Sequence, residues 1–206
     1  GTTAIACLVG SISGTVSNCY ASGLVNAPGA YYVGGLLGAN GGLVSDGYAR
    51  GSVAGSAYVG GLVGYSEAGG TVSGCYAAGQ VTGSSDVGGL AGASSGTVVN
   101  CYWDTNSTGQ ATSSGGAGRS TAQMRQHATF ESWDFAGGLW DLSESATYPY
   151  FIWQALGPFA GAVGSPPILA ARPPAPSDGA VETGEEGADE AFRPDVILTG
   201  GERIAG

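Results

Sequence analysis

Few side chains in this sequence could carry out acid–base or nucleophilic chemistry. The single histidine is His127, and Glu131, four residues later, is the carboxylate nearest to it in the sequence. A catalytic histidine needs both an orienting carboxylate and a nucleophile. The eight carboxylates before residue 155 fall mostly at different positions of the repeat described below: Asp46, Glu67, Asp86, Asp104, Glu131, Asp134, Asp141 and Glu144. We therefore expect no enzyme activity, no catalytic residue and no cofactor.

The four cysteines are the other reactive groups. They are Cys7, Cys19, Cys75 and Cys101, and no pair has the C-x-x-C spacing of a zinc site. A calcium-binding glycine-rich array would need an aspartate in every turn, and only Asp46 and Asp86 lie near turns. We therefore expect no metal site. Cys75 and Cys101 stand one repeat apart, within reach of a disulfide; a stack of small buried thiols is the alternative that we favour.

The composition limits the kinds of partner. The chain has 40 glycines among 206 residues, no lysine and a formal net charge of −10. So acidic a chain would repel phosphates, and we expect no nucleic-acid partner. The longest apolar stretches, such as 31–38, are far shorter than the roughly 20 residues of a membrane helix, so we expect no direct membrane insertion. The sequence begins in the middle of a pattern, and we interpret it as part of a longer parent chain.

Two interleaved motifs recur along the chain with one shared period. The first occurs as IACLVG at 5–10, VGGLLG at 33–38, VGGLVG at 59–64 and VGGLAG at 87–92. The second occurs as TVSNCYASG at 15–23, LVSDGYARG at 43–51, TVSGCYAAG at 71–79 and TVVNCYWDT at 97–105. Successive copies are 26 or 28 residues apart. A shared period of this size is typical of a protein built from stacked repeats.

Each unit contains short aliphatic runs punctuated by glycine, which are typical of strands and turns. No window before residue 120 has the 3.6-residue apolar period of a helix. One unit is long enough for two or three strands with corners, and stacked units bury a continuous core. We therefore predict an all-β fold over residues 1–105: a parallel β-solenoid, or β-helix, of about four coils, with the right-handed form favoured.

Alignment of the units predicts which side chains lie above one another. The aliphatic columns are Leu8, Leu36, Leu62 and Leu90, and Val16, Val44, Val72 and Val98; the aromatic column is Tyr20, Tyr48, Tyr76 and Tyr102. Rings one rung apart can stack. The column Asn18, Asp46, Gly74 and Asn100 contains only residue types that tolerate the left-handed conformation, which predicts a corner. Glycine pairs at 34–35, 60–61 and 88–89 indicate a tight bend or a close approach of backbones.

The VGGLVG motif followed by a G-T-V-S-N-C-Y-A-S-G-type segment resembles the GLUG repeat. That repeat occurs in filamentous-haemagglutinin-like adhesins exported by two-partner secretion and, outside the catalytic domain, in some streptococcal IgA peptidases. CYWDTNSTGQ at 101–110 and YPYFIWQ at 148–154 are similar to the C-terminal end of GLUG-bearing haemagglutinin-like exoproteins. The resemblance covers about residues 1–154 and transfers no catalytic residue. Two departures are Ala6-Cys7 in place of Gly-Gly, and Trp103-Asp104-Thr105 where the array is expected to end.

The rest of the chain changes character twice. Residues 106–154 are predicted to be a polar connector followed by an aromatic cap, in which 120–154 finishes the core at the end of the stack. Ser120 and Gln123 have the spacing of a capping box, which predicts a short helix over 121–129. Residues 155–206 are rich in proline and acidic residues and are predicted to be a disordered tail.

The resemblance implies a structural and adhesive repeat module at the C-terminal end of a large secreted or surface-displayed protein of the filamentous-haemagglutinin type. The alternative is a non-catalytic accessory segment of a large secreted peptidase of the IgA-peptidase type. Either implies a location at the bacterial cell surface or outside the cell. Side chains on the flanks, namely Ser17, Ser45, Ser73 and Arg50, could contact a host glycan or protein weakly and multivalently.

Overall fold

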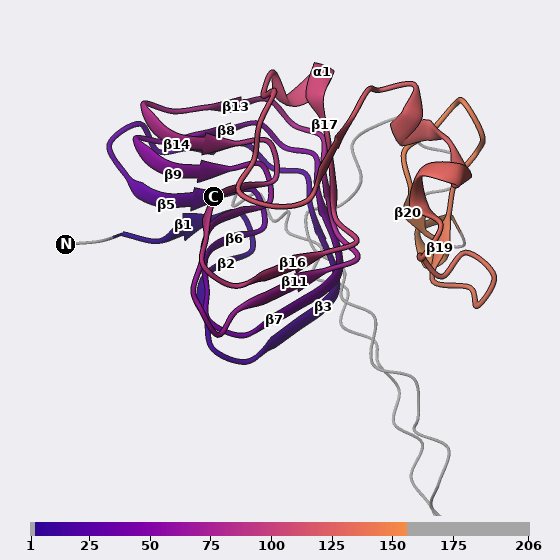
Figure 1. Ribbon diagram of the computed structural model, residues 1–206, viewed down its shortest axis with the longest axis horizontal. Coiled ribbons are helices and arrows are strands. Elements are labelled where there is room, and N and C mark those ends of the chain that lie inside the picture. Colours follow the sequence, from indigo (N-terminus) through magenta and orange to yellow (C-terminus); the bar gives the residue numbers. More distant parts are fainter. Residues whose placement is uncertain (1–2, 156–206) are drawn as a thin grey trace, which may run out of the picture. The chain divides into compact units, whose positions relative to one another are not determined.

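The computed structural model describes residues 3–155, and its first part is a β-solenoid (Figure 1). The first coil contains β1 (Ile5–Ala6), β2 (Val9–Ile12), β3 (Thr15–Ala21) and β4 (Val25–Asn26). The second contains β5 (Tyr31–Gly34), β6 (Leu37–Asn40), β7 (Leu43–Ala49) and β8 (Val53–Ala54). The third contains β9 (Ala57–Gly60), β10 (Val63–Ser66), β11 (Thr71–Ser73), β12 (Tyr76–Ala77) and β13 (Val81–Thr82). The fourth contains β14 (Ser85–Gly88), β15 (Ala91–Ser94), β16 (Thr97–Val99) and β17 (Tyr102–Asp104).

Equivalent strands of successive coils pair in parallel and form the walls of the solenoid. One wall has the order β1-β5-β9-β14, a second β2-β6-β10-β15 and a short one β4-β8-β13. The remaining wall runs from β3 through β7 to β11 and β12, then to β16 and β17. We refer to it as the tyrosine wall. The predicted all-β parallel solenoid of about four coils is therefore confirmed.

The register stacks like side chains on like. Val16 pairs with Val44, Val44 with Val72 and Val72 with Val98. The leucine column lies at the bends between two walls, where Leu36 N–H donates to Leu62 O at 2.9 Å and Leu62 N–H donates to Leu90 O at 2.8 Å. Leu36, Leu62 and Leu90 are fully buried, and Leu8 in the first coil is partly buried against the same cluster. Each coil thus adds one layer to a continuous apolar core.

The corner column interrupts the tyrosine wall at the same place in every coil. Asn18, Asp46, Gly74 and Asn100 have φ values of 51°, 51°, 60° and 52°. This left-handed region is tolerated by glycine and by the short polar side chains of asparagine and aspartate. Residues four apart in a regular strand lie on the same face, but the bend reverses the alternation of side chains between Val44 and Tyr48. Val44 is therefore buried in the core inside the coils, whereas Tyr48 is buried in the cluster formed with residues 120–155.

The glycine pairs lie where backbone segments approach each other closely, within a coil and between coils. A β-carbon built on Gly60 would overlap with the carbonyl oxygen of Val63 and would lie 2.7 Å from the amide nitrogen of Gly92. A β-carbon on Gly61 would overlap with the carbonyl oxygen of Gly89 in the next coil. Backbone atoms cannot move aside as a flexible side chain can, so these positions require the absence of a side chain.

The two ends of the stack differ. Ala117–Arg119 form β18, which pairs in parallel with β17 and begins a further layer. Gly89 N–H donates to Thr112 O, and Ser113 and Ser114 bond to the backbone of the last coil. At the other end, β1, β2, β3 and β4 pair on one side only within residues 3–155. The segment 112–119 therefore covers part of the last coil, where its backbone and serine hydroxyls bond to β17 and to residues 89–94.

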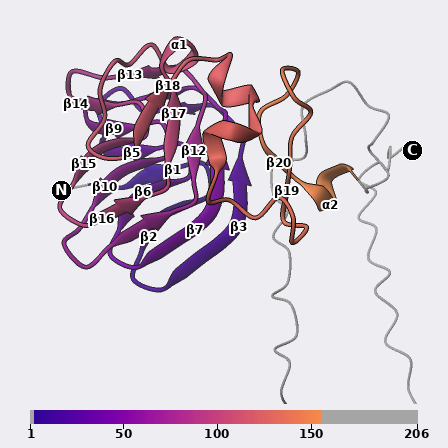
Figure 2. The same cartoon turned by 45° about the vertical axis from the view of Figure 1, so that its right-hand side comes forward.

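Residues 120–155 pack against the outside of the tyrosine wall, as Figures 1 and 2 both show. Our expectation that 120–154 would finish the core at the end of the stack is thus wrong in position, because 112–119 lies there instead. Met124, Phe130, Trp133, Trp140 and Phe151 are buried in one cluster with Tyr20, Tyr48 and Tyr76. The aromatic residues cover the tyrosine rings, which would otherwise face water.

The single helix expected over 121–129 is also corrected. Two 3₁₀-helices, η1 (Gln123–Arg125) and η2 (His127–Phe130), are separated by an extended Gln126. Met124 and Phe130 are both buried in the same cluster. In one continuous α-helix these two side chains would point about 120° apart, because six residues turn through about 600°. The break at Gln126 lets both of them face the tyrosine wall. The capping box itself forms, since Ser120 N–H donates to Gln123 Oε1 at 2.9 Å and Gln123 N–H donates to Ser120 Oγ at 3.3 Å.

Further short elements complete the described part. They are α1 (Thr105–Thr108), α2 (Ile152–Ala155) and the antiparallel pair β19 (Trp140–Asp141) and β20 (Tyr150–Phe151). No helix within residues 3–155 is long and apolar enough to cross a membrane. The acidic tail predicted over 155–206 lies outside the described residues except for Ala155.

Candidate functional site

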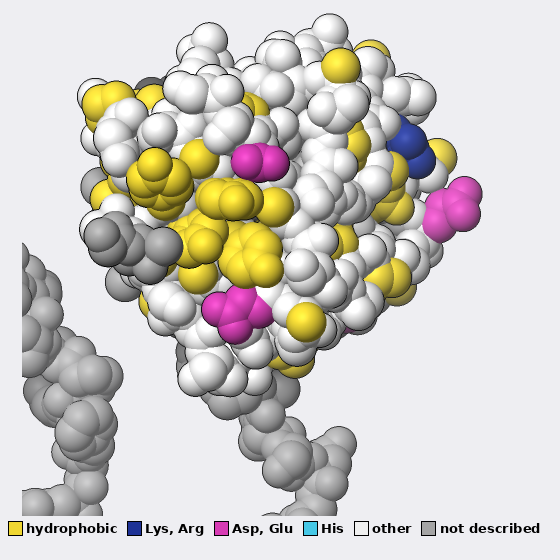
Figure 3. All heavy atoms as spheres, turned by 60° about the vertical axis from the view of Figure 1, so that its left-hand side comes forward, with side chains coloured by type: hydrophobic (Ala, Val, Ile, Leu, Met, Phe, Trp, Pro, Cys, Tyr) yellow, Lys and Arg dark blue, Asp and Glu magenta, His cyan; other side chains and the backbone are white. Residues whose placement is uncertain are grey.

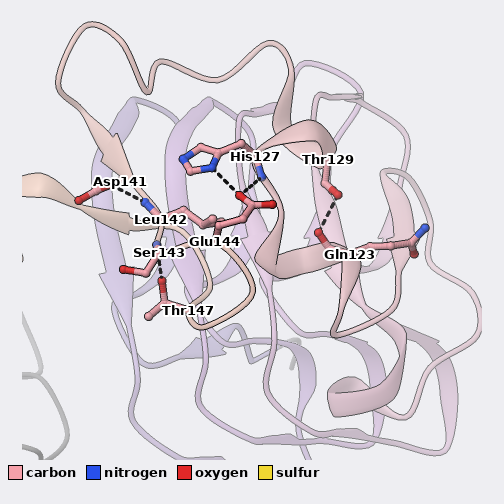
Figure 4. Close-up of polar contacts among 8 residues, drawn as sticks. All are labelled: Gln123, His127, Thr129, Asp141, Leu142, Ser143, Glu144 and Thr147. Carbon is pink, nitrogen blue, oxygen red and sulfur yellow. Dashed lines mark hydrogen bonds and ion pairs between the residues drawn. The ribbon is translucent and has the colours of Figure 1, made fainter.

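His127 pairs with a carboxylate that is distant in the sequence. Its Nδ1 lies 2.7 Å from Glu144 Oε2, and its backbone N–H donates to the same oxygen at 3.2 Å (Figure 4). These hydrogen bonds lower the pKa of Glu144. The neighbouring hydroxyls are used elsewhere: Thr129 Oγ1 donates to Gln123 O, and Thr147 Oγ1 accepts from Ser143 N–H. The carboxylate that pairs with His127 is thus Glu144 and not Glu131, and the pair joins η2 to the loop before β20. Among residues 3–155, no side-chain hydroxyl is hydrogen-bonded to His127.

The tyrosine column is a stack in three of its four coils. The ring centroids of Tyr20 and Tyr48 are 5.1 Å apart and those of Tyr48 and Tyr76 are 5.0 Å apart, with interplanar angles of 18° and 13°. Tyr102 pairs with Tyr76 in the strand register, but its ring meets Phe130 edge-on at 5.1 Å. All but Tyr102 are buried. The column is therefore an internal joint between the coils and residues 120–155.

Arg50 lies inside this joint rather than on a free flank. Its Nε donates to Tyr76 Oη at 2.7 Å and one terminal nitrogen donates to Pro149 O at 2.8 Å. The guanidinium also lies 4.8 Å from the ring centroid of Tyr48 and 5.3 Å from that of Tyr148. Such contacts hold an arginine in place without an opposing carboxylate. The guanidinium that we expected to face an external glycan is therefore engaged by groups of the same chain.

Asp104 is the most connected carboxylate of the described chain and is fully buried. As the N-cap of α1 it accepts from the N–H groups of Asn106 and Ser107 at 2.8 and 3.2 Å. Its other oxygen accepts from Thr121 Oγ1 at 2.7 Å and from Tyr148 Oη at 2.6 Å. Burial favours the neutral acid, but the hydrogen bonds prevail and the pKa of Asp104 is lowered. Sequence reasoning missed this role, although an aspartate before TNST and a following Gly109 is a helix-capping signal.

The cysteine column follows the register Cys19, Gly47, Cys75, Cys101. All four cysteines are free thiols in this structure, and the packed stack of thiols stays our prediction for Cys75 and Cys101. Cys75 Sγ donates to Ser73 O and Cys101 Sγ donates to Val99 O, each at 3.1 Å. Burial raises the pKa of the Cys75 thiol. The cysteines of this column thus pack as small apolar side chains in the core inside the coils.

We expect Cys75 and Cys101 to resist alkylation in the folded protein, because both are buried and a thiol reacts as its thiolate. The partly exposed Cys7 and Cys19 serve as internal controls and should be labelled by iodoacetamide faster than the two buried thiols, with Cys19 slower than a free thiol because burial raises its pKa. Peptide mass spectrometry before and after addition of denaturant measures the difference. Labelling of all four thiols at equal rates without denaturant, or a Cys75–Cys101 disulfide in the unreduced protein, would contradict this expectation.

The serine column lies on the outer face of the tyrosine wall. Ser17 is exposed, whereas Ser45 and Ser73 are half-buried, and the register continues to the exposed Val99. The hydroxyls therefore form a row in three coils and not in the fourth. Within the part of the chain that the structure describes, no group of three or more histidine, cysteine, aspartate or glutamate side chains could hold a metal ion.

A groove of about 420 Å³ lies where residues 120–131 meet the last coil. Its polar lining comes from β17, β18, η1, η2 and the residues beside them, and consists of Tyr102, Arg119, Gln123, Gln126, Thr129 and Glu131. The Arg119 guanidinium lies 5.5 Å from the ring centroid of Tyr102. One positive group, one negative group and two amides thus face one space, which suits a polar ligand. No periodic pattern of residues indicated this groove, because its lining residues come partly from the repeat and partly from the region beyond it.

Residues 55–82 match the family described as the GLUG motif. The match covers the third coil. The predicted resemblance to the GLUG repeat is confirmed over these residues. A protein of Evansella cellulosilytica named "Putative Gly-rich membrane protein" is 35% identical over 142 residues, which are 66% of this chain and 14% of that relative. The chain thus spans about 14% of the length of the curated relative that it matches. No solved structure matches this chain.

Proposed function

We propose that this chain is a structural and adhesive repeat module of a long bacterial protein, of the filamentous-haemagglutinin type, that is secreted or displayed at the cell surface. The observation that carries the proposal is the in-register stack of coils, one of which matches the GLUG motif. A second support is the small share of a longer relative to which the chain aligns. The module is non-catalytic and needs no cofactor.

The physical basis is the way a solenoid grows. Each coil contacts only its neighbours, so duplication of a unit lengthens the module without a new fold. Parallel backbone hydrogen bonds and buried columns of leucine and valine run through all coils. Such a rod is stiff and leaves its backbone inaccessible to proteases. These properties suit a spacer that holds the rest of the parent chain away from a cell.

The adhesive part of the proposal concerns the flanks of the rod. Its partners are a host-cell glycan or protein, bound through several weak contacts that add up along the parent chain. Ser17 and the polar groove beside Tyr102 are external groups that could make such contacts. The net charge of −10 disfavours nucleic acid, and the rod does not itself insert into a membrane.

The test uses the complete parent protein in the bacterium that makes it. An antibody raised against residues 3–155 should label intact cells, which would show that the segment is outside the cell. Protease treatment of the same cells should leave the segment intact, which would show that it is folded there. Deletion of the segment should reduce attachment to host cells, and a deletion of equal length in another part of the parent rod is the matched control. Labelling only after lysis would overturn the surface location. A zinc-protease signature elsewhere in the parent chain would instead indicate the accessory segment of a peptidase.

A further inference from the structure

The wall formed by β1, β5, β9 and β14 contains a second left-handed corner, and tyrosines occupy it. Tyr32, Tyr58 and Asp86 stand directly before the register partners Val33, Val59 and Val87. Their φ values are 52°, 53° and 49°. The first corner uses asparagine, aspartate and glycine for the same backbone conformation. A bulky side chain in this region is strained, and such strain is concentrated at functional sites.

The two corner tyrosines form an external cluster with Tyr65 of β10. The ring centroids of Tyr32 and Tyr58 are 5.1 Å apart, those of Tyr32 and Tyr65 are 5.3 Å apart, and those of Tyr58 and Tyr65 are 6.0 Å apart. The rings are partly exposed, and Tyr31 beside them is 46% exposed. Figure 3 shows hydrophobic side chains gathered on this side of the solenoid, with acidic side chains near them. We name Tyr32, Tyr58 and Tyr65 the tyrosine platform.

The platform is not part of the folding core. None of its members belongs to the three buried clusters, which consist of residues inside the coils and of the aromatic joint on the tyrosine wall. The strained backbone at Tyr32 and Tyr58 is therefore not offset by burial in a core. The fourth coil also shows that an aspartate, Asp86, satisfies the same corner. Tyrosine is thus not required at this corner for folding.

The chemistry around the platform selects a class of ligand. Exposed aromatic faces pack against the C–H faces of a sugar ring, while phenol hydroxyls and a carboxylate bond to its hydroxyl groups. Tyr65 Oη and Ser95 Oγ, 3.3 Å apart, and Asp86 supply such groups. The chain has no lysine, and the three arginines of residues 3–155, which are Arg50, Arg119 and Arg125, lie over other tyrosine rings. Within the described part of the chain the site thus has a carboxylate and no cation, which disfavours acidic sugars.

We propose that the tyrosine platform binds a neutral saccharide. This inference rests on the proposed adhesive function and assigns it a site and a ligand class. The platform is distinct from the groove beside Tyr102, and it shares no residue with that groove. Direct binding to the purified chain tests it, and this measurement does not depend on where the parent protein is located. A negative result would therefore overturn the saccharide site while leaving the proposed display of the module intact.

The decisive variant is the double substitution Tyr32→Asn with Tyr58→Asn, which gives this corner a residue type that the chain uses in its first corner. The neutral probes are three trisaccharides, built from N-acetylglucosamine, from mannose and from galactose. A hyaluronan fragment is the acidic comparison ligand and choline is the cationic one. Saturation-transfer NMR and calorimetry with the purified full chain measure binding. We expect one neutral trisaccharide to bind, and its affinity to fall more than about tenfold in the double variant. The melting temperature should stay equal or rise, because the strain is relieved.

Leu24→Ser is the matched control, since Leu24 is a 71% exposed apolar residue that belongs to none of the platform contacts. It should bind the trisaccharide as the unchanged chain does. Three results would overturn the proposal: no response to any neutral probe, binding of choline or hyaluronan alone, or equal saccharide affinity in the double variant. A lower melting temperature of the double variant would show that the tyrosines are structural, and the proposal would fall with its premise.

Discussion

Gly60→Ala is expected to prevent the coils from stacking. Gly60 lies in the third coil, between two coils that cannot move apart without loss of their hydrogen bonds. The new β-carbon would meet Val63 O, Gly92 N and Leu90 O, all of them backbone atoms. Overpacking in a core typically costs 1–3 kcal/mol, and here no side chain can rotate away. We expect a loss of at least about 3 kcal/mol in the free energy of unfolding.

The matched control is Gly69→Ala in the same coil. A β-carbon there meets only Gly41 O at 3.9 Å, an ordinary contact. Because alanine restricts the unfolded chain more than glycine does, this variant should be unchanged or more stable by about 0.4–1 kcal/mol. Urea denaturation followed by far-UV circular dichroism compares the two. Equal stability of both variants would mean that the coils are spaced more widely at Gly60 than the structure indicates.

Asp104→Ala should release residues 120–155 from the tyrosine wall. The substitution leaves two backbone N–H groups and the hydroxyls of Thr121 and Tyr148 without their acceptor. A buried group that loses its partner costs roughly 1–3 kcal/mol, and part of this is recovered where water reaches the gap. We therefore expect a loss of about 3–5 kcal/mol. Tryptophan fluorescence reports this step, because Trp133, Trp140 and Trp153 all lie in the released part.

Asp104→Asn is the control of equal shape. Its oxygen can accept from the two backbone N–H groups, and its amide can donate to the hydroxyls of Thr121 and Tyr148 after they rotate. We expect a loss of less than half of that seen for alanine. A cost for asparagine as large as that for alanine would show that the negative charge of Asp104, rather than its hydrogen-bonding pattern, holds the segment.

The same carboxylate sets a dependence on pH. The pKa of Asp104 is lower in the folded protein than the usual value of about 3.9 in an unfolded chain. Its stabilising effect is therefore complete above about pH 4 and is lost as the pH falls through the lowered folded-state pKa. Acid titration of tryptophan fluorescence should show residues 120–155 loosening below about pH 4, and Asp104→Asn should weaken this dependence.

The repeat was accessible to sequence reasoning because its constraints recur. A corner that needs Asn, Asp or Gly appears in all four units, and a glycine pair that must lack side chains appears in three of them, so both features stand out without an alignment. The packing of residues 120–155 has no such period. Arg50 bonds to Pro149 and Asp104 bonds to Tyr148, and neither contact recurs in the other coils. Residue types alone do not predict a contact between distant segments that occurs once.

The corner at Tyr32 and Tyr58 shows a different limit. Residue type predicts a left-handed backbone where it is Asn, Asp or Gly, and tyrosine gives the opposite indication. Only the alignment of Tyr32 with Asp86 across coils carried a hint. His127 was likewise assigned its nearest carboxylate in sequence, whereas the fold brings Glu144 to it. Proximity along the chain is a poor guide where two loops meet.

The layer formed by 112–119 bears on where the stack can lengthen. It pairs with β17 and bonds to residues 89–94, so it occupies part of the face on which a coil after the fourth would stack. A repeat unit inserted between two existing coils would find equivalent strands on both of its sides, whereas a unit inserted after the fourth coil would have to displace this layer. Duplication within the array is therefore expected to disturb the module less than duplication at this end.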